Sequence, residues 1–242
     1  MFNLNQLINQ KAMNYSKKLA ALLLMLFVGV AAFAQKSETR TPGSFTKIEN
    51  NGSWDVYVTK GSKDEVRLES SNFDLSKVIT KVENETLKIK LEKGNWNNVN
   101  LKVYVTVRNL ESVGNGGSGD MILESDFGSN NFNIGLSGSG TITAKNITAD
   151  RLNVGMSGSG KVIIAGGQAD KATIGQSGSG DLEALDFTAD VVDIGKSGSG
   201  NTSIGVTESL TVGSSGSGNV YYRGNPEKQS IGVSGSSRVV KK

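Results

Sequence analysis

The chain has 242 residues, of which 36% are hydrophobic, 6% aromatic and 20% charged, and it contains neither cysteine nor histidine. Without cysteine there are no disulfides, and without histidine the commonest general base and the commonest transition-metal ligand are missing. Three of the 26 basic residues precede residue 35, so the remaining 23 balance the 23 acidic residues. This balance gives no indication of a nucleic-acid partner.

Residues 1–34 have the features of a signal peptide. The pair Lys17-Lys18 precedes an apolar run over residues 19–30, and residues 32–34 form a small-x-small cleavage site. The apolar run is shorter than the ~20 residues that a membrane-spanning helix needs, and no later segment is apolar enough to span. We therefore expect cleavage after Ala34, export through the inner membrane, and no transmembrane segment in the mature protein.

Residues 35–110 alternate apolar and polar side chains, although without a regular repeat. Phe73–Lys81 predicts a short helical turn opened by Asp74. We expect this segment to be an N-terminal cap with the first, imperfect coils of a larger stack, because a bare end would expose unpaired strand edges. The predicted strands are Phe45–Glu49, Trp54–Thr59, Glu65–Glu69, Thr86–Leu91 and Leu101–Arg108.

Residues 111–242 carry a Ser-Gly-Ser-Gly tetrad that returns about every twenty residues. A fixed period in this range is typical of repeat architectures, whose units are too small to bury a core alone. One unit fits one coil of a parallel β-solenoid, with strands of successive coils ~4.8 Å apart. We expect residues 35–242 to form one continuous all-β domain. The tetrads begin at Ser137, Ser157, Ser177, Ser197 and Ser215.

Apolar columns appear when the units are aligned on their tetrads. Period-two alternation on both sides of a glycine-rich corner predicts strand–turn–strand with one face buried. Two columns precede the tetrad and two follow it. They comprise Phe132, Leu152, Ala172, Val192 and Leu210; Ile134, Val154, Ile174, Ile194, Val212 and Ile231; Ile142, Val162, Leu182, Thr202 and Val220; and Ala144, Ile164, Ala184, Ile204 and Tyr222.

Glycines form three further columns. Two lie inside the tetrad, where we expect structural turns with positive φ: Gly138, Gly140, Gly158, Gly160, Gly178, Gly180, Gly198, Gly200, Gly216 and Gly218. The third lies two residues before the tetrad and predicts a bulge or a close backbone approach within the strand: Gly135, Gly155, Gly175, Gly195, Gly213 and Gly232.

Two segments have the composition of ion-binding sites. Gly155–Lys161 fits most of the phosphate-binding pattern G-x-x-x-x-G-K-[ST], but Val162 replaces the hydroxyl residue and a strand follows, so a solenoid corner is the better interpretation. An acidic column seven positions before the tetrads would suit calcium, or would be solvated turn residues partly balanced by Arg151 and Lys171. Both interpretations stay open for this column, which consists of Asp150, Asp170, Asp190 and Glu208.

Tyr221, Tyr222 and Arg223 form the densest aromatic and cationic cluster and are a weak candidate for stacking on a sugar ring. The alternative is that Tyr222 continues a core column while Tyr221 covers the last coil. No pair of carboxylates is singled out from the repeat, and a serine nucleophile would lack its usual base. We therefore predict no catalytic residues, no metal site and no cofactor.

Trp54–Val58, Leu87–Ile89, the serial Gly-Ser-Gly turns and Tyr221–Pro226 together resemble the putative auto-transporter adhesin, head GIN domain family, from about Phe45 to Ser237. The resemblance implies an exported protein of Gram-negative bacteria with a right-handed β-helix related in shape to pectin lyases. It also implies an absence of catalytic residues and a proposed role in cell adhesion.

The leading hypothesis is a non-enzymatic, exported solenoid that binds a surface glycan or protein, located in the periplasm, on the outer-membrane surface or outside the cell. Identical surface groups repeated at ~4.8 Å suit extended partners. The alternatives are a carbohydrate-active, pectin-lyase-like enzyme on the same scaffold, and a structural envelope component that self-associates as coils dock end to end.

Overall fold

The computed structural model describes residues 36–242, and the predicted signal peptide at residues 1–34 lies outside them. No helix in this part of the chain is long and apolar enough to cross a membrane. The described elements are β1 (Lys36–Arg40), β2 (Lys47–Asn50), β3 (Asp55–Lys60), β4 (Glu65–Ser70), η1 (Leu75–Lys77), β5 (Val78–Glu83), β6 (Thr86–Leu91), β7 (Leu101–Val107), β8 (Ser112–Asn115), β9 (Met121–Leu136), β10 (Thr141–Met156), β11 (Lys161–Ile164), β12 (Gly167–Gly178), β13 (Asp181–Gly198), β14 (Thr202–Gly216), β15 (Val220–Arg223), β16 (Lys228–Gly235) and β17 (Val239–Lys241).

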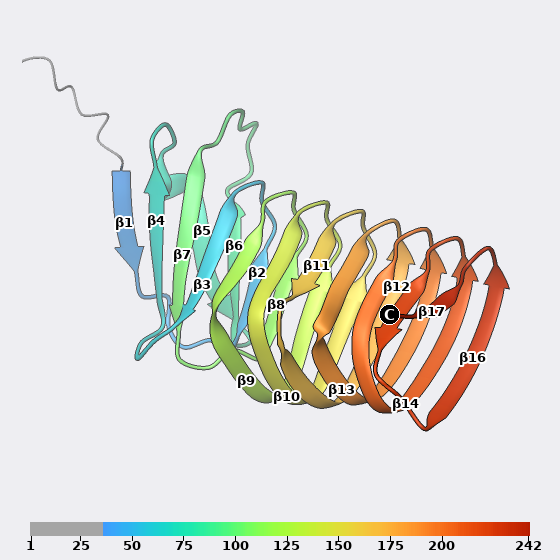
Figure 1. Cartoon of the computed structure of the whole chain (residues 1–242). Coiled ribbons are helices and arrows are strands. Elements are labelled where there is room, and N and C mark those ends of the chain that lie inside the picture. Colours follow the sequence, from blue (N-terminus) through green and yellow to red (C-terminus); the bar gives the residue numbers. More distant parts are fainter. Residues whose placement is uncertain (1–35) are drawn as a thin grey trace, which may run out of the picture. The chain divides into compact units, whose positions relative to one another are not determined.

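From β9 to β17 the strands stack in parallel as consecutive coils (Figure 1). Val154 pairs with Ile174 and Ile174 with Ile194, so each step along the stack is one repeat unit of the sequence. Because every unit places the same residue types at the same register, the backbone N–H and C=O groups of one coil form hydrogen bonds with those of the next. The predicted all-β parallel solenoid, with one repeat unit in each coil, is confirmed.

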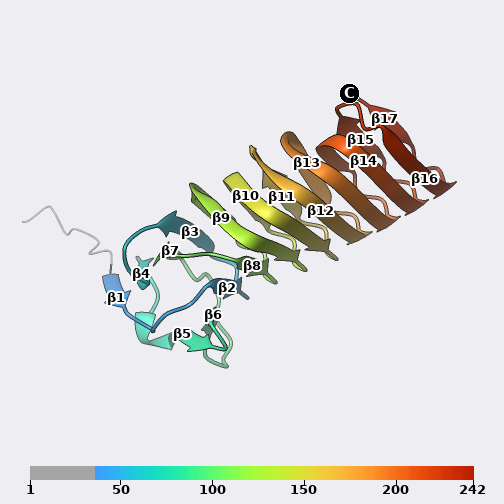
Figure 2. The same cartoon turned by 90° about the horizontal axis from the view of Figure 1, so that it is seen from below.

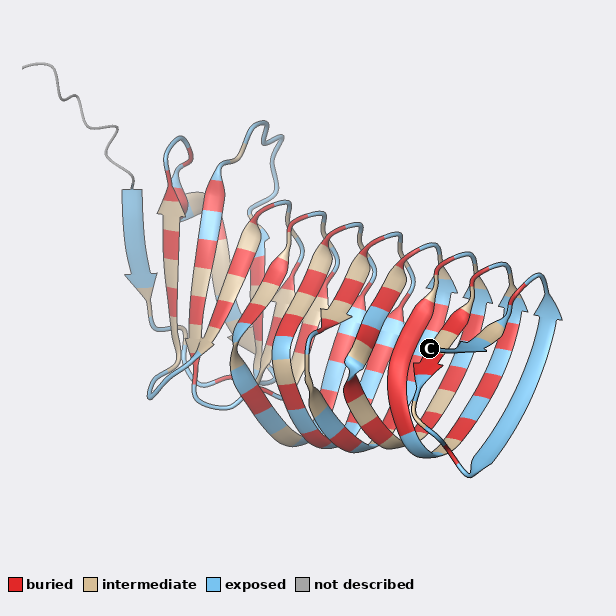
Figure 3. Cartoon of the chain, in the orientation of Figure 1, coloured by how far each residue is buried: buried red, intermediate tan, exposed pale blue. Residues whose placement is uncertain are grey.

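The apolar columns fill the interior of this stack, and buried residues alternate with more exposed ones along most of its strands (Figure 3). Ile174 is 1% exposed and Phe132 is fully buried. All four predicted columns are buried as far as Tyr222, which is 8% exposed. Ile231 is the exception at 47%, because no further coil of the described chain covers β16.

The tetrad glycines line up along one edge of the stack, but the reason predicted for them is mostly wrong. Positive φ occurs at only three of them, Gly178, Gly198 and Gly216. At the other seven predicted positions the requirement is steric, because an added Cβ would overlap backbone of the preceding coil. For Gly200 that backbone is Gly180, whose carbonyl carbon would lie 2.7 Å away. Close approach of successive corners therefore excludes any side chain there.

The glycine column before each tetrad shows neither a bulge nor a close approach, so that prediction is also wrong. A Cβ on Gly155, Gly175 or Gly195 would meet nothing within 4 Å. These residues are exposed and keep strict register with the neighbouring coils. The column is therefore a bare strip on the outside of the stack.

Polar side chains inside the corners donate hydrogen bonds to backbone carbonyl groups. Asn115 Nδ2 donates a hydrogen bond to Gly119 O at 2.6 Å. Gln176 Nε2 and Lys196 Nζ donate in the same way to Gly180 O and Gly200 O. Lys196 is only 5% exposed, and its burial lowers the pKa of its ammonium group.

The N-terminal part contains the predicted strands as β2, β3, β4, β6 and β7, together with β1 and β5, which were not predicted. Its arrangement in space does not follow the chain order. β2 pairs with both β6 and β8, and β3 pairs with both β7 and β9, all in parallel. The first coil therefore lies between the β4–β7 segment and the regular stack, and β4–β7 forms the outer layers with antiparallel pairs (Figure 2).

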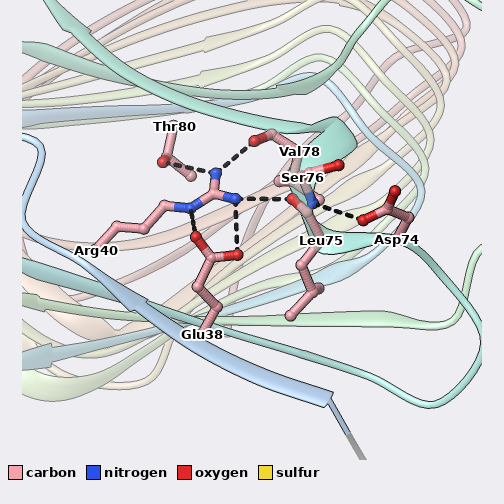
Figure 4. Close-up of polar contacts among 7 residues, drawn as sticks. All are labelled: Glu38, Arg40, Asp74, Leu75, Ser76, Val78 and Thr80. Carbon is pink, nitrogen blue, oxygen red and sulfur yellow. Dashed lines mark hydrogen bonds and ion pairs between the residues drawn. The ribbon is translucent and has the colours of Figure 1, made fainter.

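A network around Arg40 fastens β1 to the cap. The helical turn predicted over Phe73–Lys81 is limited to η1, since β5 begins at Val78. The Asp74 carboxylate accepts a hydrogen bond from Ser76 N at 3.1 Å, as expected of the residue that opens the turn. The Arg40 guanidinium donates to Leu75 O at 2.7 Å, to Val78 O and to the Glu38 carboxylate (Figure 4). The hydrogen bond from Arg40 is the main cause that lowers the pKa of Glu38.

Candidate binding groove

A groove of about 700 Å³ runs along the stack across four coils, where each coil bends between its two long arms. We call it the axial groove. Its walls repeat from coil to coil because its residues occupy equivalent positions in β9, β10, β12 and β13, and Thr207 of β14 lies at its end. The lining residues are Gly128, Ser129, Asn130, Thr148, Ala149, Asp150, Gln168, Ala169, Asp170, Thr188, Asp190 and Thr207.

Three adjacent columns make the groove. The first contains Thr148, Gln168 and Thr188, which pair with one another in register. The second is alanine, with Ala149 8% and Ala169 6% exposed. A methyl group is the largest side chain at these two positions, so the space between the polar columns stays open.

The third column carries the charge, and it comprises Asp150, Asp170 and Asp190. No lysine or arginine of the described residues lines the groove. Asp190 accepts a hydrogen bond from Thr207 Oγ1 at 2.7 Å. Lys171, expected to balance the column in part, has its ion pair with Asp193 on the next coil, at 2.6 Å from Nζ. The groove is therefore a row of carboxylates, hydroxyls and amides with net negative charge.

The acidic column is not arranged as a metal centre. The described residues contain no group of three or more carboxylates, histidines or cysteines that could hold a metal ion. Glu208 also falls out of line. The coil that contains it is shorter, its register shifts between Ala189 and Val191, and Thr207 takes the lining position beside Asp190.

Tyr221, Tyr222 and Arg223 are separated by the alternation of β15. Tyr222 is 8% exposed and continues a core column, while Tyr221 lies outside with Lys242 Nζ 4.6 Å from its ring centroid. Arg223 pairs with Asp186 at 2.9 Å. The structure therefore does not bring the three side chains together as one stacking surface.

The segment resembling a phosphate-binding loop is a solenoid corner followed by β11. Its lysine, Lys161, pairs with Glu183 on the next coil at 2.7 Å, and this contact raises the pKa of the ammonium group. Val162 is fully buried. The resemblance to the phosphate-binding motif arises because a glycine-rich corner is followed directly by an outward-facing lysine.

A second, shallower hollow follows the bare glycine strip. It is lined by Gly114, Gly135 and Gly155 with polar residues on both sides. One of these flanks is held by a hydrogen bond from Asn153 Nδ2 to Asn133 Oδ1 at 3.0 Å. It holds about 480 Å³ in its larger part, and fewer polar groups converge on it than on the axial groove.

Sequence reasoning found the acidic column but missed the groove. The signal was the Thr/Gln-Ala-Asp triplet that recurs at Thr148–Asp150, Gln168–Asp170 and Thr188–Asp190. Each triplet is unremarkable in one coil, and its alanine makes a hollow only when the coils are stacked.

A family model for "Putative auto-transporter adhesin, head GIN domain" matches residues 44–226. The chain is similar to the solved structure of a putative adhesin from Bacteroides fragilis, with a TM-score of 0.80 and 23% identity, covering 86% of this chain and 97% of that one. It is also similar to a putative lipid binding protein from Parabacteroides distasonis (TM-score 0.69, 24% identity, covering 86% and 96%) and to a putative adhesin from Parabacteroides merdae (0.70, 18%, 86% and 96%). These structures share the fold with this chain. No curated protein matches it.

Proposed function

This chain belongs to the putative auto-transporter adhesin, head GIN domain family, and we propose that it is a non-enzymatic binding protein of the cell envelope whose axial groove holds an extended, hydroxyl-rich polymer. A glycan chain is the partner that best matches this chemistry. The observation that supports the proposal is the continuous row of polar groups across four coils.

Carboxylates and side-chain amides suit sugar hydroxyls, since an ionised carboxylate accepts hydrogen bonds at both oxygens. Asp150, Asp170 and Asp190 offer this acceptor at one position in three successive coils. Thr148 and Thr188 on the opposite wall can donate or accept. A polymer lying along the stack would meet the same set of groups at each step.

Single contacts of this kind are weak in water, and affinity then comes from repetition. Once one unit of a polymer is held, the next binds at a high effective concentration without new translational cost. We therefore expect affinity to rise steeply with oligomer length until the groove is filled. A monosaccharide should bind too weakly to detect.

The charge of the groove determines which polymers it accepts. Because the described lining contains three carboxylates and no lysine or arginine, uronic-acid or sulfated chains are repelled and neutral or amine-bearing chains are favoured. Nearby charges are screened over about 8 Å at physiological salt, so this discrimination sharpens as the salt concentration falls.

Calorimetric titration of the purified protein with neutral, amine-bearing and anionic oligosaccharides of increasing length tests the proposal. Replacing Asp150 and Asp170 together by alanine should abolish binding. Asp126→Ala removes an exposed carboxylate that pairs with Lys145 outside the groove, and it should leave binding unchanged. Binding that survives in the groove variant, or that prefers anionic chains, would contradict the proposed site.

The same samples separate binding from catalysis. A carbohydrate-active enzyme would release new reducing or unsaturated ends from the oligosaccharides during prolonged incubation, whereas a binding protein would return them intact. Appearance of such ends, lost in the Asp150→Ala and Asp170→Ala double variant, would replace our proposal by the enzymatic one.

We propose export as part of this function, on the basis of the predicted signal peptide and the family. Cell fractionation gives the compartment, and proteolysis of intact cells tells whether the protein reaches the outer surface. Retention in the cytoplasm of a chain that keeps its predicted signal peptide would contradict export.

A further inference from the structure

The C-terminal end of the stack is an open strand edge. Among the described strands β16 pairs only with β14, and all eight of its residues are exposed (Figure 3). In a parallel strand half of the backbone N–H and C=O groups point toward each neighbour, so those on the outer side of β16 have no strand of the described chain to bond. β17 likewise pairs with a single described strand, β15, so one of its edges is also open.

Apolar side chains accompany this edge. Ile231 and Val233 occupy positions that are interior in the preceding coils, and they are 47% and 39% exposed because no described coil follows. Val240 on β17 is 37% exposed. These three are, with Trp96, the exposed large hydrophobic residues of the described part of the chain. The end coil therefore exposes unpaired backbone groups and apolar side chains that a further layer of strands would cover.

The opposite end is protected against such pairing. β1 and β5 are the outer strands there, since each pairs with a single described strand. The sequence Lys36-Ser-Glu-Thr-Arg40 of β1 places a charge at every second position, and β5 carries Lys81 and Glu83. Charged residues on an edge strand are a common defence against edge-to-edge association. In contrast, residues 229–237 contain no charged residue and no proline. The two ends therefore differ along most of β16, whose one charge is Lys228 at its first residue, while β17 ends at Lys241.

We propose that the C-terminal coil is a dimer interface, at which β16 and β17 pair antiparallel with β16 and β17 of a second copy of this chain. A twofold axis perpendicular to the stack makes such an isologous contact. Gly232 and Val240 each lie four residues from Ser236 at the corner, so one axis can pass near the centres of both strands.

The side chains are compatible with this symmetry. Pairing centred on Gly232 places Ile231 opposite Val233 of the second copy, and Lys228 opposite the uncharged Ser236, just beyond the far end of β16. Pairing centred on Val240 places Lys241 opposite Val239 of the second copy. Within β16 and β17 no two like charges face each other directly, which would be destabilising across a strand pair. The like-charged pair in this register, Arg238 with Lys242 of the second copy, lies just outside the ends of β17. The head-to-tail alternative would place this edge on β1 and β5, which both carry charges.

Sedimentation velocity of the purified protein, at concentrations up to about 0.1 mM where an interface with a micromolar Kd is saturated, measures the dimer. We expect the wild type to be dimeric, and Ile231→Lys with Val233→Lys to raise the dissociation constant at least tenfold. Both substituted side chains are partly solvated, so circular dichroism and melting should stay close to wild type. Ser37→Lys with Thr39→Lys adds the same charge to β1 and should leave the dimer intact.

Charge reversal identifies the partner as a second copy. The Ile231→Glu, Val233→Glu variant should also be monomeric, and an equal mixture of the lysine and glutamate variants should recover the dimer through opposite charges across the strand pair. A monomeric wild type, a lysine variant that still dimerises, or a mixture that stays monomeric would each overturn the proposal.

Discussion

Replacing Gly200 by alanine should destabilise the stack, although it adds only one methyl group. The new Cβ would overlap the carbonyl oxygen of Gly180 and lie 2.7 Å from its carbonyl carbon. Ordinary contacts of this kind begin at 3.4 Å, so the carbon contact alone requires the two corners to separate by about 0.7 Å, and the closer oxygen contact requires more. The hydrogen bonds that Ser199 N and Gly200 N donate to Gly178 O, at 3.0 and 3.3 Å, would then be broken.

The cost follows from those bonds. Two backbone hydrogen bonds at ~0.5–1.5 kcal/mol each, with lost packing around the corner, amount to roughly 2–3 kcal/mol. For a domain of about 200 residues this lowers the Tm by roughly 5–10 °C. Thermal unfolding followed by circular dichroism measures the change directly.

The chain provides a matched control five residues earlier. Gly195 has no atom within 4 Å of an added Cβ and no positive φ. Gly195→Ala should therefore leave the stability unchanged or raise it by ~0.4–1 kcal/mol, since alanine restricts the unfolded chain. If the two variants melted at the same temperature, close approach of the corners would not be the reason for glycine in the tetrad.

Three further predictions follow from other parts of the structure. Ile174→Asp places an unpaired carboxylate at a position 1% exposed, and should cost roughly 4 kcal/mol or more, seen as loss of the cooperative melting transition. Burial lowers the pKa of Lys196 below 10.5 in the folded state, so the free energy of unfolding of the wild type should rise as the pH increases through that folded-state pKa toward 10.5. Urea unfolding at several pH values should show a smaller rise in the Lys196→Met variant. Arg40→Ala removes the hydrogen bonds that the guanidinium donates to Leu75 O in η1 and Val78 O in β5, and should weaken the cap by about 1–3 kcal/mol, with faster amide exchange confined to β1 and its neighbours.

The core was predictable from the sequence because two independent periods coincide. Alternation within a strand assigns Ile174 to the inside, and the repeat places it between Val154 and Ile194. Each period alone leaves the partner strand unknown. Together they give both the face and the register, so burial of the four columns could be predicted for every coil with a neighbour above and below.

The role of the glycines could not be settled in the same way. Composition indicates only that a side chain is excluded or unnecessary, and the physical reason differs among columns. At Gly200 the adjoining coil excludes a side chain, at Gly198 the backbone has a φ of 133°, and at Gly195 neither condition applies. The sequence does not separate these cases, because the backbone φ and the contacts between successive coils both depend on the folded arrangement.

The N-terminal arrangement was not predictable for a related reason. β2 and β3 are short alternating strands like their neighbours, and nothing local shows that β8 and β9 will return to pair with them. The pairing of β3 with β7 joins Asp55 to Lys102, which are far apart in the chain. Without a repeat in this segment, the sequence contains no register from which the order of layers follows.

Coil length sets the extent of the axial groove, and this connects the repeat with the proposed function. Between Ile134 and Ile194 successive coils have the same length, so Asp150, Asp170 and Asp190 fall on one line. The next coil is shorter, since Val212 already lies opposite Ile194.

The shorter coil has fewer residues in its bend, which is the part that would otherwise extend the groove. The column consequently ends at Asp190 with Thr207 bonded to it, and at the other end Asn130 replaces the acid. The groove is therefore a segment of fixed length, three carboxylates with an uncharged residue at each end. Because the tetrad corners hold the coils at a constant separation, the number of full-length coils determines how many sugar residues of a bound polymer make contact. Inserting one more full-length coil between β10 and β12 should therefore lengthen the preferred oligosaccharide accordingly.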